Sequence, residues 1–321
     1  MNSMIQTVDL TKKFNDFVAN DHINLDVKEQ EIKCIVGENG AGKSTTMNMI
    51  TGYIASTEGK VMIDGHDILE EPEAAKKCIG YLPEIPPLYM EMTVREYLEF
   101  AAELKGIKKD KRESQIEEVI RLAKLRDVEN RLIQNLSKGY KQRVGLAQAI
   151  LGFPEVIILD EPTVGLDPKI IEIRELIRKL AKKHTVILSS HILAEVREVC
   201  DYIMIISGGK LVASDTTENL ENMMSGKGQI EVEAKASRDE MDHIIRRTGK
   251  IKEVKYRTSA SSITTAQIIA KGGEDIREEL FLAFSHADVP MLTLNQSKTT
   301  LEEIFLELTQ GSGNRMIKEE K

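Results

Sequence analysis

The chain has 321 residues, of which 41% are hydrophobic and 30% charged, with a net charge of −8 and a pI near 5.5. This length is typical of two domains, and the acidic balance argues against a nucleic-acid binder, which normally carries a basic face. No apolar stretch approaches the roughly 20 residues needed to span a bilayer, and the N-terminus shows no secretion signal, so we expect a soluble, cytoplasmic protein.

The first part of the chain predicts short strands over Ile5–Leu10 and Ile23–Val27, followed by an apolar, buried strand over Ile32–Val36. Phe14, between the first two strands, fits two roles equally well: an aromatic ring that stacks on adenine, or a residue of the core. Cys34 lies in the third strand, and we expect it to be a small buried thiol. The three cysteines are far apart and lack metal-ligand spacing.

A glycine-rich loop follows the third strand and precedes a predicted helix over Thr45–Ile50. It matches G-x-x-x-x-G-K-[ST] with Gly37, Glu38, Asn39, Gly40, Ala41, Gly42, Lys43 and Ser44. Strand, loop and helix in this order place backbone N–H groups at a positive helix end, and the glycines let the backbone wrap phosphate oxygens. We expect Lys43 to reach the β- and γ-phosphates and the Ser44 hydroxyl to bind Mg²⁺. The alternative is a glycine turn followed by a chance Lys-Ser.

The chain becomes helical after two further predicted strands, 59–64 and 79–82. Thr93 and Glu96 form a capping-box pattern at the start of the first of these helices. We therefore expect a helical subdomain over about residues 85–152, inserted between β-rich stretches.

The sheet then resumes with the apolar run Val156–Leu159, which ends in two acids. Asp160 is suited to hold the water shell of a magnesium ion, and Glu161 could orient or deprotonate an attacking water. The alternative for this pair is an exposed turn. A Ser/Gly loop over Leu136–Gln142 lies just upstream and opens a helix, which makes it another potential phosphate site.

The C-terminal third has a different hydrophobic pattern, with strict polar–apolar alternation over 230–235, as in a half-exposed strand. The predicted order from 225 to 310 is β-α-β-β-α-β, a ferredoxin-like α+β arrangement. A last helix over 300–308 carries an apolar stripe that could pack on its own sheet, on the first domain or on a second copy. We expect residues 311–321 to be a disordered polar tail.

These motifs, in this order, resemble those of the ATP-binding subunits of ABC transporters, over about Ile5–Ala213. The glycine loop resembles Walker A, the strand ending in Asp160 and Glu161 resembles Walker B, and the Ser/Gly loop resembles the signature sequence. Gly165-Leu166-Asp167 resembles the D-loop, and His191 the switch histidine. The resemblance implies an α/β P-loop NTPase cassette over residues 1–224.

The resemblance also implies how the motifs work together. In the family, two subunits sandwich two ATP molecules, so Ser137 and Gly139 are expected to act in trans. His191 is expected to contact the γ-phosphate and to be catalytic together with Glu161. The nucleotide set implied for this chain comprises the eight loop residues with Phe14, Thr45, Glu84, Ser137, Gly139, Asp160 and Asp167.

Three positions depart from the family pattern. Lys138 and Tyr140 stand where the signature has glycine and glutamine, although the phosphate-facing Ser137 and Gly139 are kept. Glu84 stands where the family has the Q-loop glutamine that senses Mg²⁺ and the membrane partner. We expect it to supply an oxygen as a charge, so the expected metal set is Ser44, Asp160 and Glu84.

The segments Ile79–Glu84 and Thr300–Leu308 look like those of bacterial ABC-2-type exporters, whose ATPase pairs with a separate membrane permease. We therefore expect ATP and Mg²⁺ as cofactors, a homodimer or paired ATPase subunit, and a place at the cytoplasmic face of the membrane without a transmembrane segment. The competing class is a soluble ABC protein that acts on ribosomes or nucleic acid. Such proteins usually have tandem cassettes or a long coiled-coil insertion, which this chain lacks, so no direct nucleic-acid contact is expected.

Overall fold

A computed structural model describes residues 2–163, 170–220, 229–258, 263–297 and 301–316. Contacts divide the chain into two units, Met1–Thr216 with the segment from Leu308 onward, and Thr217–Glu307. Among the helices of the described ranges, none has the length and apolar character needed to cross a membrane.

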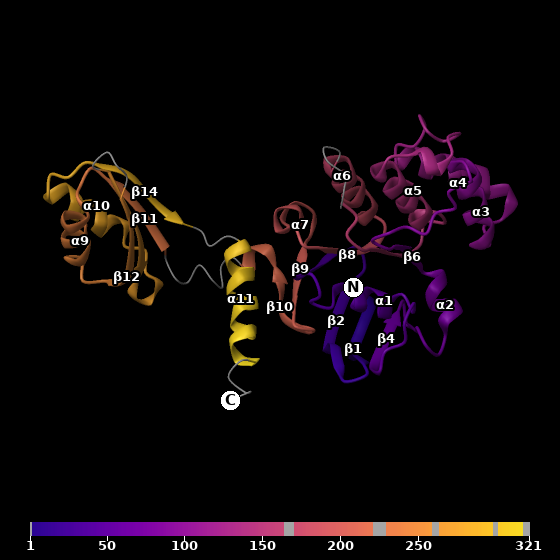
Figure 1. Ribbon diagram of the computed structural model, residues 1–321, viewed down its shortest axis with the longest axis horizontal. Helices are drawn as coiled ribbons and strands as arrows, with labels where there is room; N and C mark the ends of the chain where they lie inside the picture. Colours follow the sequence, from indigo (N-terminus) through magenta and orange to yellow (C-terminus); the bar gives the residue numbers. More distant parts are fainter. Residues whose placement is uncertain (1, 164–169, 221–228, 259–262, 298–300, 317–321) are drawn as a thin grey trace. The chain divides into compact units, whose positions relative to one another are not determined.

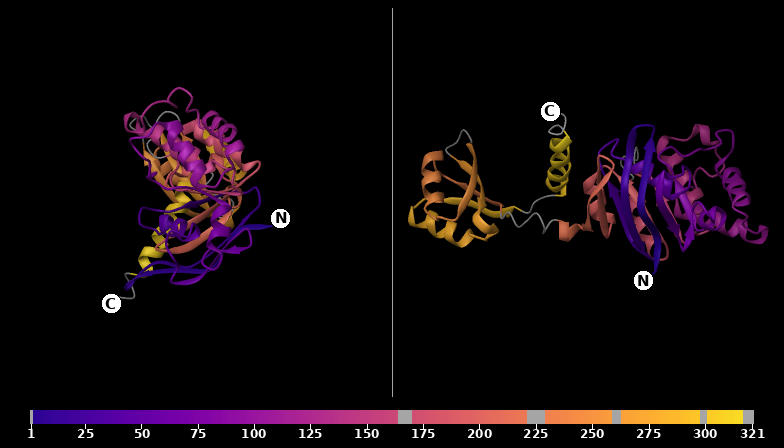
Figure 2. Two further views of the ribbon diagram at one scale, coloured as in Figure 1. Left: turned by 90° about the vertical axis from the view of Figure 1, so that its right-hand side faces the viewer. Right: turned by 90° about the horizontal axis from the view of Figure 1, so that it is seen from below.

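An antiparallel sheet of four strands forms one layer of the first unit, in the order β2-β1-β4-β5. Its strands are β1 Ser3–Phe14, β2 Phe17–Lys28, β4 Glu58–Ile63 and β5 His66–Asp67. β1 and β2 are longer than predicted and run side by side (Figure 2) down to the pair Phe14–Phe17. The prediction stopped at polar residues, but an antiparallel strand with one solvated face accommodates polar side chains on that face.

A six-stranded sheet forms the second layer, in the order β10-β9-β3-β8-β7-β6. Its strands are β3 Ile32–Val36, β6 Ile79–Leu82, β7 Val156–Leu159, β8 Thr185–Ser190, β9 Tyr202–Ser207 and β10 Lys210–Thr216. All neighbours are parallel except β9 and β10. β3, β7 and β8 are buried along their whole length, as expected for central parallel strands covered on both faces. Cys34 is fully buried, which confirms the expected buried thiol, and this burial raises the pKa of its side chain.

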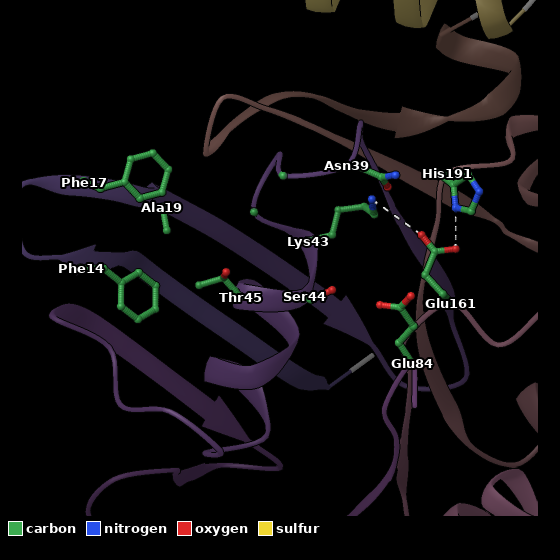
Figure 3. Close-up of a pocket in the computed structure, with 12 residues that line it drawn as sticks. Phe14, Phe17, Ala19, Asn39, Lys43, Ser44, Thr45, Glu84, Glu161 and His191 are labelled. Carbon is green, nitrogen blue, oxygen red and sulfur yellow. Dashed lines mark hydrogen bonds and ion pairs between the residues drawn. The ribbon is translucent and has the colours of Figure 1, made fainter. Parts of the chain in front are cut away.

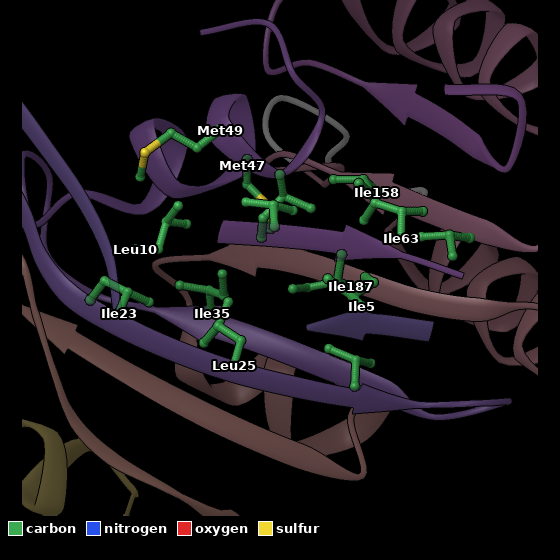
Figure 4. Close-up of a cluster of buried hydrophobic side chains, with 14 of the residues drawn as sticks. Ile5, Leu10, Ile23, Leu25, Ile35, Met47, Met49, Ile63, Ile158 and Ile187 are labelled. Atoms are coloured by element: carbon green, nitrogen blue, oxygen red, sulfur yellow. The ribbon is translucent and has the colours of Figure 1, made fainter. Parts of the chain in front are cut away.

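Helices cover both faces of this second sheet (Figure 1). α6 Ile170–Ala181 and α7 Leu193–Val199 lie on one face, while α1 Lys43–Ile50 lies on the other, toward the first sheet. The side chains of Met47 and Met49 on α1 are buried in one cluster with residues of both sheets (Figure 4). The apolar packing therefore fixes α1, and with it the glycine loop at its N-terminus.

The predicted helical subdomain lies between β6 and β7 in the chain. It contains α3 Val94–Leu104, α4 Lys109–Leu122, the 3₁₀ turn η1 Ile133–Asn135 and α5 Lys138–Ile150, while α2 Pro72–Lys77 precedes β6. Figure 1 shows α3, α4 and α5 grouped beside β6, the edge strand of the six-stranded sheet. The capping box is confirmed, because Thr93 accepts from the Glu96 backbone and Glu96 from that of Thr93.

Two glycines let α5 approach β6 closely. A Cβ at Gly80 would lie 2.1 Å from the carbonyl oxygen of Ala149, and one at Gly145 would lie 2.7 Å from Pro86. Backbone and ring atoms cannot rotate away as a flexible side chain can. This contact ties α5, whose N-cap is Ser137, to the strand that leads to Glu84.

Gly80→Ala should therefore destabilise the first unit by about 1–3 kcal/mol, the usual cost of overpacking. Urea denaturation followed by circular dichroism measures the change. Gly106→Ala calibrates the other cost that a glycine substitution can carry: its φ is 67° and a Cβ there meets no atom within 4 Å, so its loss of roughly 1–2 kcal/mol comes from backbone strain alone. An unchanged stability of Gly80→Ala would show that β6 and α5 separate without cost.

The second unit has the predicted ferredoxin-like order. Its elements are β11 Gln229–Ala234, α9 Arg238–Arg246, β12 Ile251–Thr258, β13 Thr264–Ala270, the turn η2 Lys271–Gly273, α10 Arg277–His286 and β14 Met291–Ser297. The four strands form an antiparallel sheet in the order β12-β13-β11-β14. One face of this sheet shares an apolar core with Met241 and Ile245 of α9 and Leu280 and Phe284 of α10.

The last helix, α11 Leu301–Met316, begins as predicted, and Leu301 and Ile304 of its apolar stripe are buried. The helix is described as far as Met316, into the first part of the stretch expected to be a polar tail. Adding a residue to an existing helix costs far less than starting one, which lets the backbone continue through Gly311 and Gly313.

Candidate active site

A cavity of about 570 Å³ lies where the tip of the β1–β2 hairpin, the glycine loop and the carboxyl ends of β7 and β8 meet (Figure 3). Its lining residues are Phe14, Phe17, Ala19, Asn39, Gly40, Gly42, Lys43, Ser44, Thr45, Glu84, Glu161 and His191. All of them except Phe17 and Ala19 belong to the set predicted to bind nucleotide or to act in catalysis. Residues from widely separated motifs therefore meet in one place.

The glycine loop has the backbone that its sequence requires. Gly40 and Gly42 have φ of 83° and 106°, in the left-handed region that favours glycine. A Cβ at Gly37 would lie 2.5 Å from the carbonyl oxygen of Ile206, so this position also has no space for a side chain. Lys43 is buried, and its Nζ donates to the carbonyls of Gly37 at 2.9 Å and Glu38 at 3.3 Å. The loop thus curls around the ammonium group of its own lysine.

Glu161 lies between Lys43 of the glycine loop and His191. Lys43 Nζ lies 3.7 Å from Glu161 Oε1, and His191 Nδ1 lies 2.9 Å from Glu161 Oε2 (Figure 3). The Glu161 side chain is only 7% exposed, so the alternative of an exposed turn is wrong. Its φ of 49° is a left-handed conformation that a non-glycine residue keeps only where the surroundings enforce it.

Ser189, a residue that the sequence analysis did not single out, organises the two acids. Its Oγ donates to Asp160 Oδ1 at 2.5 Å and accepts from the backbone N–H of Glu161 at 2.9 Å. The only sequence signal for it was its position at the end of an apolar run just before His191, and that β8 lies beside β7 is known from the strand pairing. Asp160 itself is buried and fixed at the carboxyl end of β7.

Asp160 does not line the first cavity but borders a neighbouring one of about 630 Å³, which it shares with Ser44 and Glu84. The three expected metal ligands therefore lie around one space. Within the described ranges, no group of three or more His, Cys, Asp or Glu residues is arranged to hold a metal ion. A hydroxyl and one or two carboxylates fit Mg²⁺, which keeps several waters and is otherwise bound by substrate phosphates.

Two phenylalanines form the far end of the cavity. Phe14 is 49% exposed, so its assignment to the core is excluded, and Lys12 Nζ lies 5.1 Å from its ring centre. Phe17 is 66% exposed and pairs with Phe14 across the hairpin. Phe17 was not among the predicted site residues, because the second strand was expected to begin only at Ile23. The F-N-D-F spacing was the available signal.

The signature residues do not join this cavity. Ser137 caps α5, where its Oγ accepts from the backbone N–H of Tyr140 at 3.4 Å, and neither it nor Gly139 is a lining residue. Ala41, a residue of the glycine loop, is buried and does not line the cavity. Asp167 and the rest of the expected D-loop lie outside the described residues.

The known proteins that are similar to this chain agree with its fold and its motifs. A family model described as "ABC transporter" matches residues 20–164. The chain is 40% identical over 224 residues to the bacitracin transport ATP-binding protein BcrA of Bacillus licheniformis, covering 69% of this chain and 72% of that protein.

Solved structures give the same result. The structure of an ATP-binding subunit of an ABC transporter matches with a TM-score of 0.65 and 30% identity, over 69% of this chain and 93% of that chain. A dimeric ATP-binding cassette in a post-hydrolysis state, bound to ADP and phosphate, matches with a TM-score of 0.62 and 28% identity, over 66% and 98%. The chain therefore belongs to the ATP-binding proteins of the ABC transporter family, and is an ATPase subunit that uses ATP and Mg²⁺ and couples hydrolysis to transport through a membrane permease.

Proposed function

We propose that this chain powers export through a separate ABC-2-type permease, with Glu161 as the base that activates the attacking water. The observation that carries the assignment of the site is the convergence of Lys43, Glu161 and His191 at the glycine loop. The exporter subtype is supported by the resemblance of Ile79–Glu84 and by a relative named for bacitracin transport.

Each side chain has a distinct task in this proposal. Lys43 and the loop N–H groups supply positive charge to the β- and γ-phosphates. Ser44 and Asp160, with Glu84 beside them, would hold Mg²⁺, which neutralises phosphate charge when bound. Glu161 takes a proton from water, and His191 orients that carboxylate through Nδ1 while its other ring nitrogen is assigned to the γ-phosphate.

The signature loop completes the site from a second cassette. Ser137 and Gly139 lie at the N-terminus of α5, where helix N–H groups favour phosphate, yet they do not line this chain's own cavity. We assign them, with Asp167, to the nucleotide held by the partner's glycine loop. The partner is a second copy of this chain or a related ATPase subunit.

We place the permease contact at the neighbouring cavity. Its lining residues Tyr53 and Ile85 are 79% and 82% exposed, so a partner can bury large apolar surface there. The Tyr81 hydroxyl donates to Asn48 Oδ1 in its wall at 3.1 Å, and burial raises the pKa of Tyr81, which keeps this donor protonated. Glu84 lines both cavities, and the contact would hold the chain at the cytoplasmic face of the membrane.

We divide the chain functionally into an ATPase domain over 1–224, with its helical subdomain at about 85–152, and an accessory domain over 225–310. The residues of the nucleotide cavity run only from Phe14 to His191. The accessory domain is therefore not needed to build the nucleotide site within one chain.

The proposed function is tested by purifying the tagged chain from membranes, identifying the copurifying permease and measuring ATP-dependent export in vesicles. Ile85→Glu places a charge on the proposed contact, so it should lose the permease while keeping the ATPase rate of the isolated subunit. Glu29→Gln, an exposed change in the turn before β3, should keep both. Cosedimentation with ribosomes without any membrane partner would favour the competing class instead.

Replacing both Phe14 and Phe17 with Ala should weaken ATP binding by about tenfold or more, because base–aromatic stacking contributes roughly 1–3 kcal/mol per base. Stacking contacts only the π-face of the base, which every base has, so the affinity for GTP should fall by the same factor. Fluorescent-nucleotide titration measures both affinities. The control is Phe281→Ala, which changes a phenylalanine of the second unit with a similar exposure of 57%. An unchanged ATP affinity of the double variant would show that neither ring contacts the nucleotide.

A further inference from the structure

A buried carboxylate on α7 lies behind the proposed catalytic pair. Glu195 is 7% exposed, and its Oε2 accepts a hydrogen bond from Thr163 Oγ1 at 2.5 Å. Its Oε1 lies 3.6 Å from Arg174 Nη2 on α6. Burying a carboxylate is costly unless it is paired and hydrogen-bonded, and here both oxygens have a partner from a different part of the chain.

The Thr163–Glu195 hydrogen bond joins the segments that carry the two members of the pair. Thr163 comes two residues after Glu161, and Glu195 comes four residues after His191. Ser190 Oγ accepts from the backbone N–H of Ile192 at 3.0 Å, which orders the turn between His191 and α7. A shift of Thr163 relative to Glu195 would therefore change the contact between Glu161 and His191.

Glu161 needs such support because of its backbone. Its left-handed φ of 49° is held on the amino side by the hydrogen bond from its N–H to Ser189 Oγ. On the carboxyl side, Pro162 leads directly to Thr163, whose hydroxyl is fixed by Glu195. The hydrogen bonds made by Ser189 and Glu195 therefore hold the chain on both sides of Glu161.

We propose that Thr163 and Glu195 are positioning residues for ATP hydrolysis: together they hold the Glu161 carboxylate against His191. This inference rests on the proposed role of Glu161 as the base. Neither residue lines the nucleotide cavity, so they act through Glu161 and His191 and are not expected to contribute to nucleotide affinity.

Thr163→Val removes the hydroxyl while keeping the shape, and should lower kcat by about 10- to 100-fold, the scale for a misplaced catalytic group. The KM for ATP and the affinity for a fluorescent nucleotide should remain unchanged. Thr163→Ser restores the hydroxyl and should recover most of the rate. Glu195→Gln keeps an acceptor oxygen but removes its charge, so it should weaken the bond from Thr163 and lower kcat by less than Thr163→Val does. The double variant should be no slower than Thr163→Val alone, because both changes act through one contact.

Glu198→Gln is the matched control. Glu198 is on the same helix and pairs with the same Arg174 at 2.5 Å, but its side chain is 60% exposed. Equal losses in Glu198→Gln and Glu195→Gln, or losses that parallel a drop in Tm and in ATP affinity, would show a purely structural ion pair and overturn the proposal.

Glu161→Gln distinguishes a failure of the base assignment from a failure of the positioning role. If it abolishes turnover while Thr163→Val and Glu195→Gln keep the full rate, the positioning role is wrong and the base assignment stands. If Glu161→Gln itself keeps the rate, the base assignment fails, and the positioning role fails with it. In the Glu161→Gln background, Thr163→Val should give no further loss, since it acts through the missing carboxylate.

Discussion

Glu161→Gln is expected to lower ATP turnover by about 100-fold or more, which is the range for loss of a general base. The amide keeps the size of the side chain and can still accept from His191, but it cannot take a proton from water. Lys43 loses a neighbouring negative charge 3.7 Å away, which should leave ATP binding intact. We therefore expect slow hydrolysis, retained ATP affinity and an ATP-bound dimer detectable by size-exclusion chromatography.

Glu155→Gln is the matched control for this prediction. Glu155 is exposed and directly precedes β7, at the end of the strand opposite to Glu161. The same chemical change there should leave turnover unchanged. A normal rate in Glu161→Gln would move the catalytic role to another group, and a loss of ATP binding would show that the carboxylate acts in folding the loop.

The parts of the site that could be predicted from sequence are those that depend on local geometry. The glycine loop needs left-handed backbone at Gly40 and Gly42, and the structure has it. A run of four apolar residues followed by an acid predicts the end of a buried parallel strand, which β7 provides. The capping box at Thr93 is likewise complete within four residues. In each case neighbouring residues determine the conformation.

The parts that could not be predicted depend on residues far apart in the chain. Ser189 reaches Asp160 across 29 positions and Thr163 reaches Glu195 across 32, and no periodicity marks such partners. They meet because β7 and β8 are adjacent in the sheet, and strand order is a tertiary property. Phe17 was missed for a related reason, since pairing with β1 extends β2 beyond its apolar core.

Sequence also could not show which residues act on the nucleotide of their own chain and which act on that of a second cassette. Sequence spacing placed Lys43 and Ser137 in separate motifs, and only the resemblance to a family implied that they meet across a dimer. The structure adds that Ser137 does not line the cavity of its own chain. Whether a second cassette supplies the missing residue is a property of the assembly, which a mixture of two inactive variants can measure.

Lys43→Ala should abolish turnover because it removes the charge that neutralises the phosphates, and Ser137→Arg should abolish it by placing a bulky cation at the phosphate site. The Ser137→Arg variant should still bind ATP to the isolated subunit, since its own glycine loop is intact. Loss of the Ser137 cap costs α5 about 1 kcal/mol, so the Tm of this variant is measured alongside.

Mixing the two inactive variants should restore activity. In a mixed dimer, one composite site combines the Lys43→Ala change in one subunit's loop with the Ser137→Arg change in the other's signature, and the second site has neither change. With random pairing in a two-fold symmetric dimer, about a quarter of the wild-type rate should return. If both residues served the same chain's site, every site would carry one lesion and no pairing could restore it. Absence of recovery in dimers that are verified as mixed by two different tags would therefore contradict the trans arrangement.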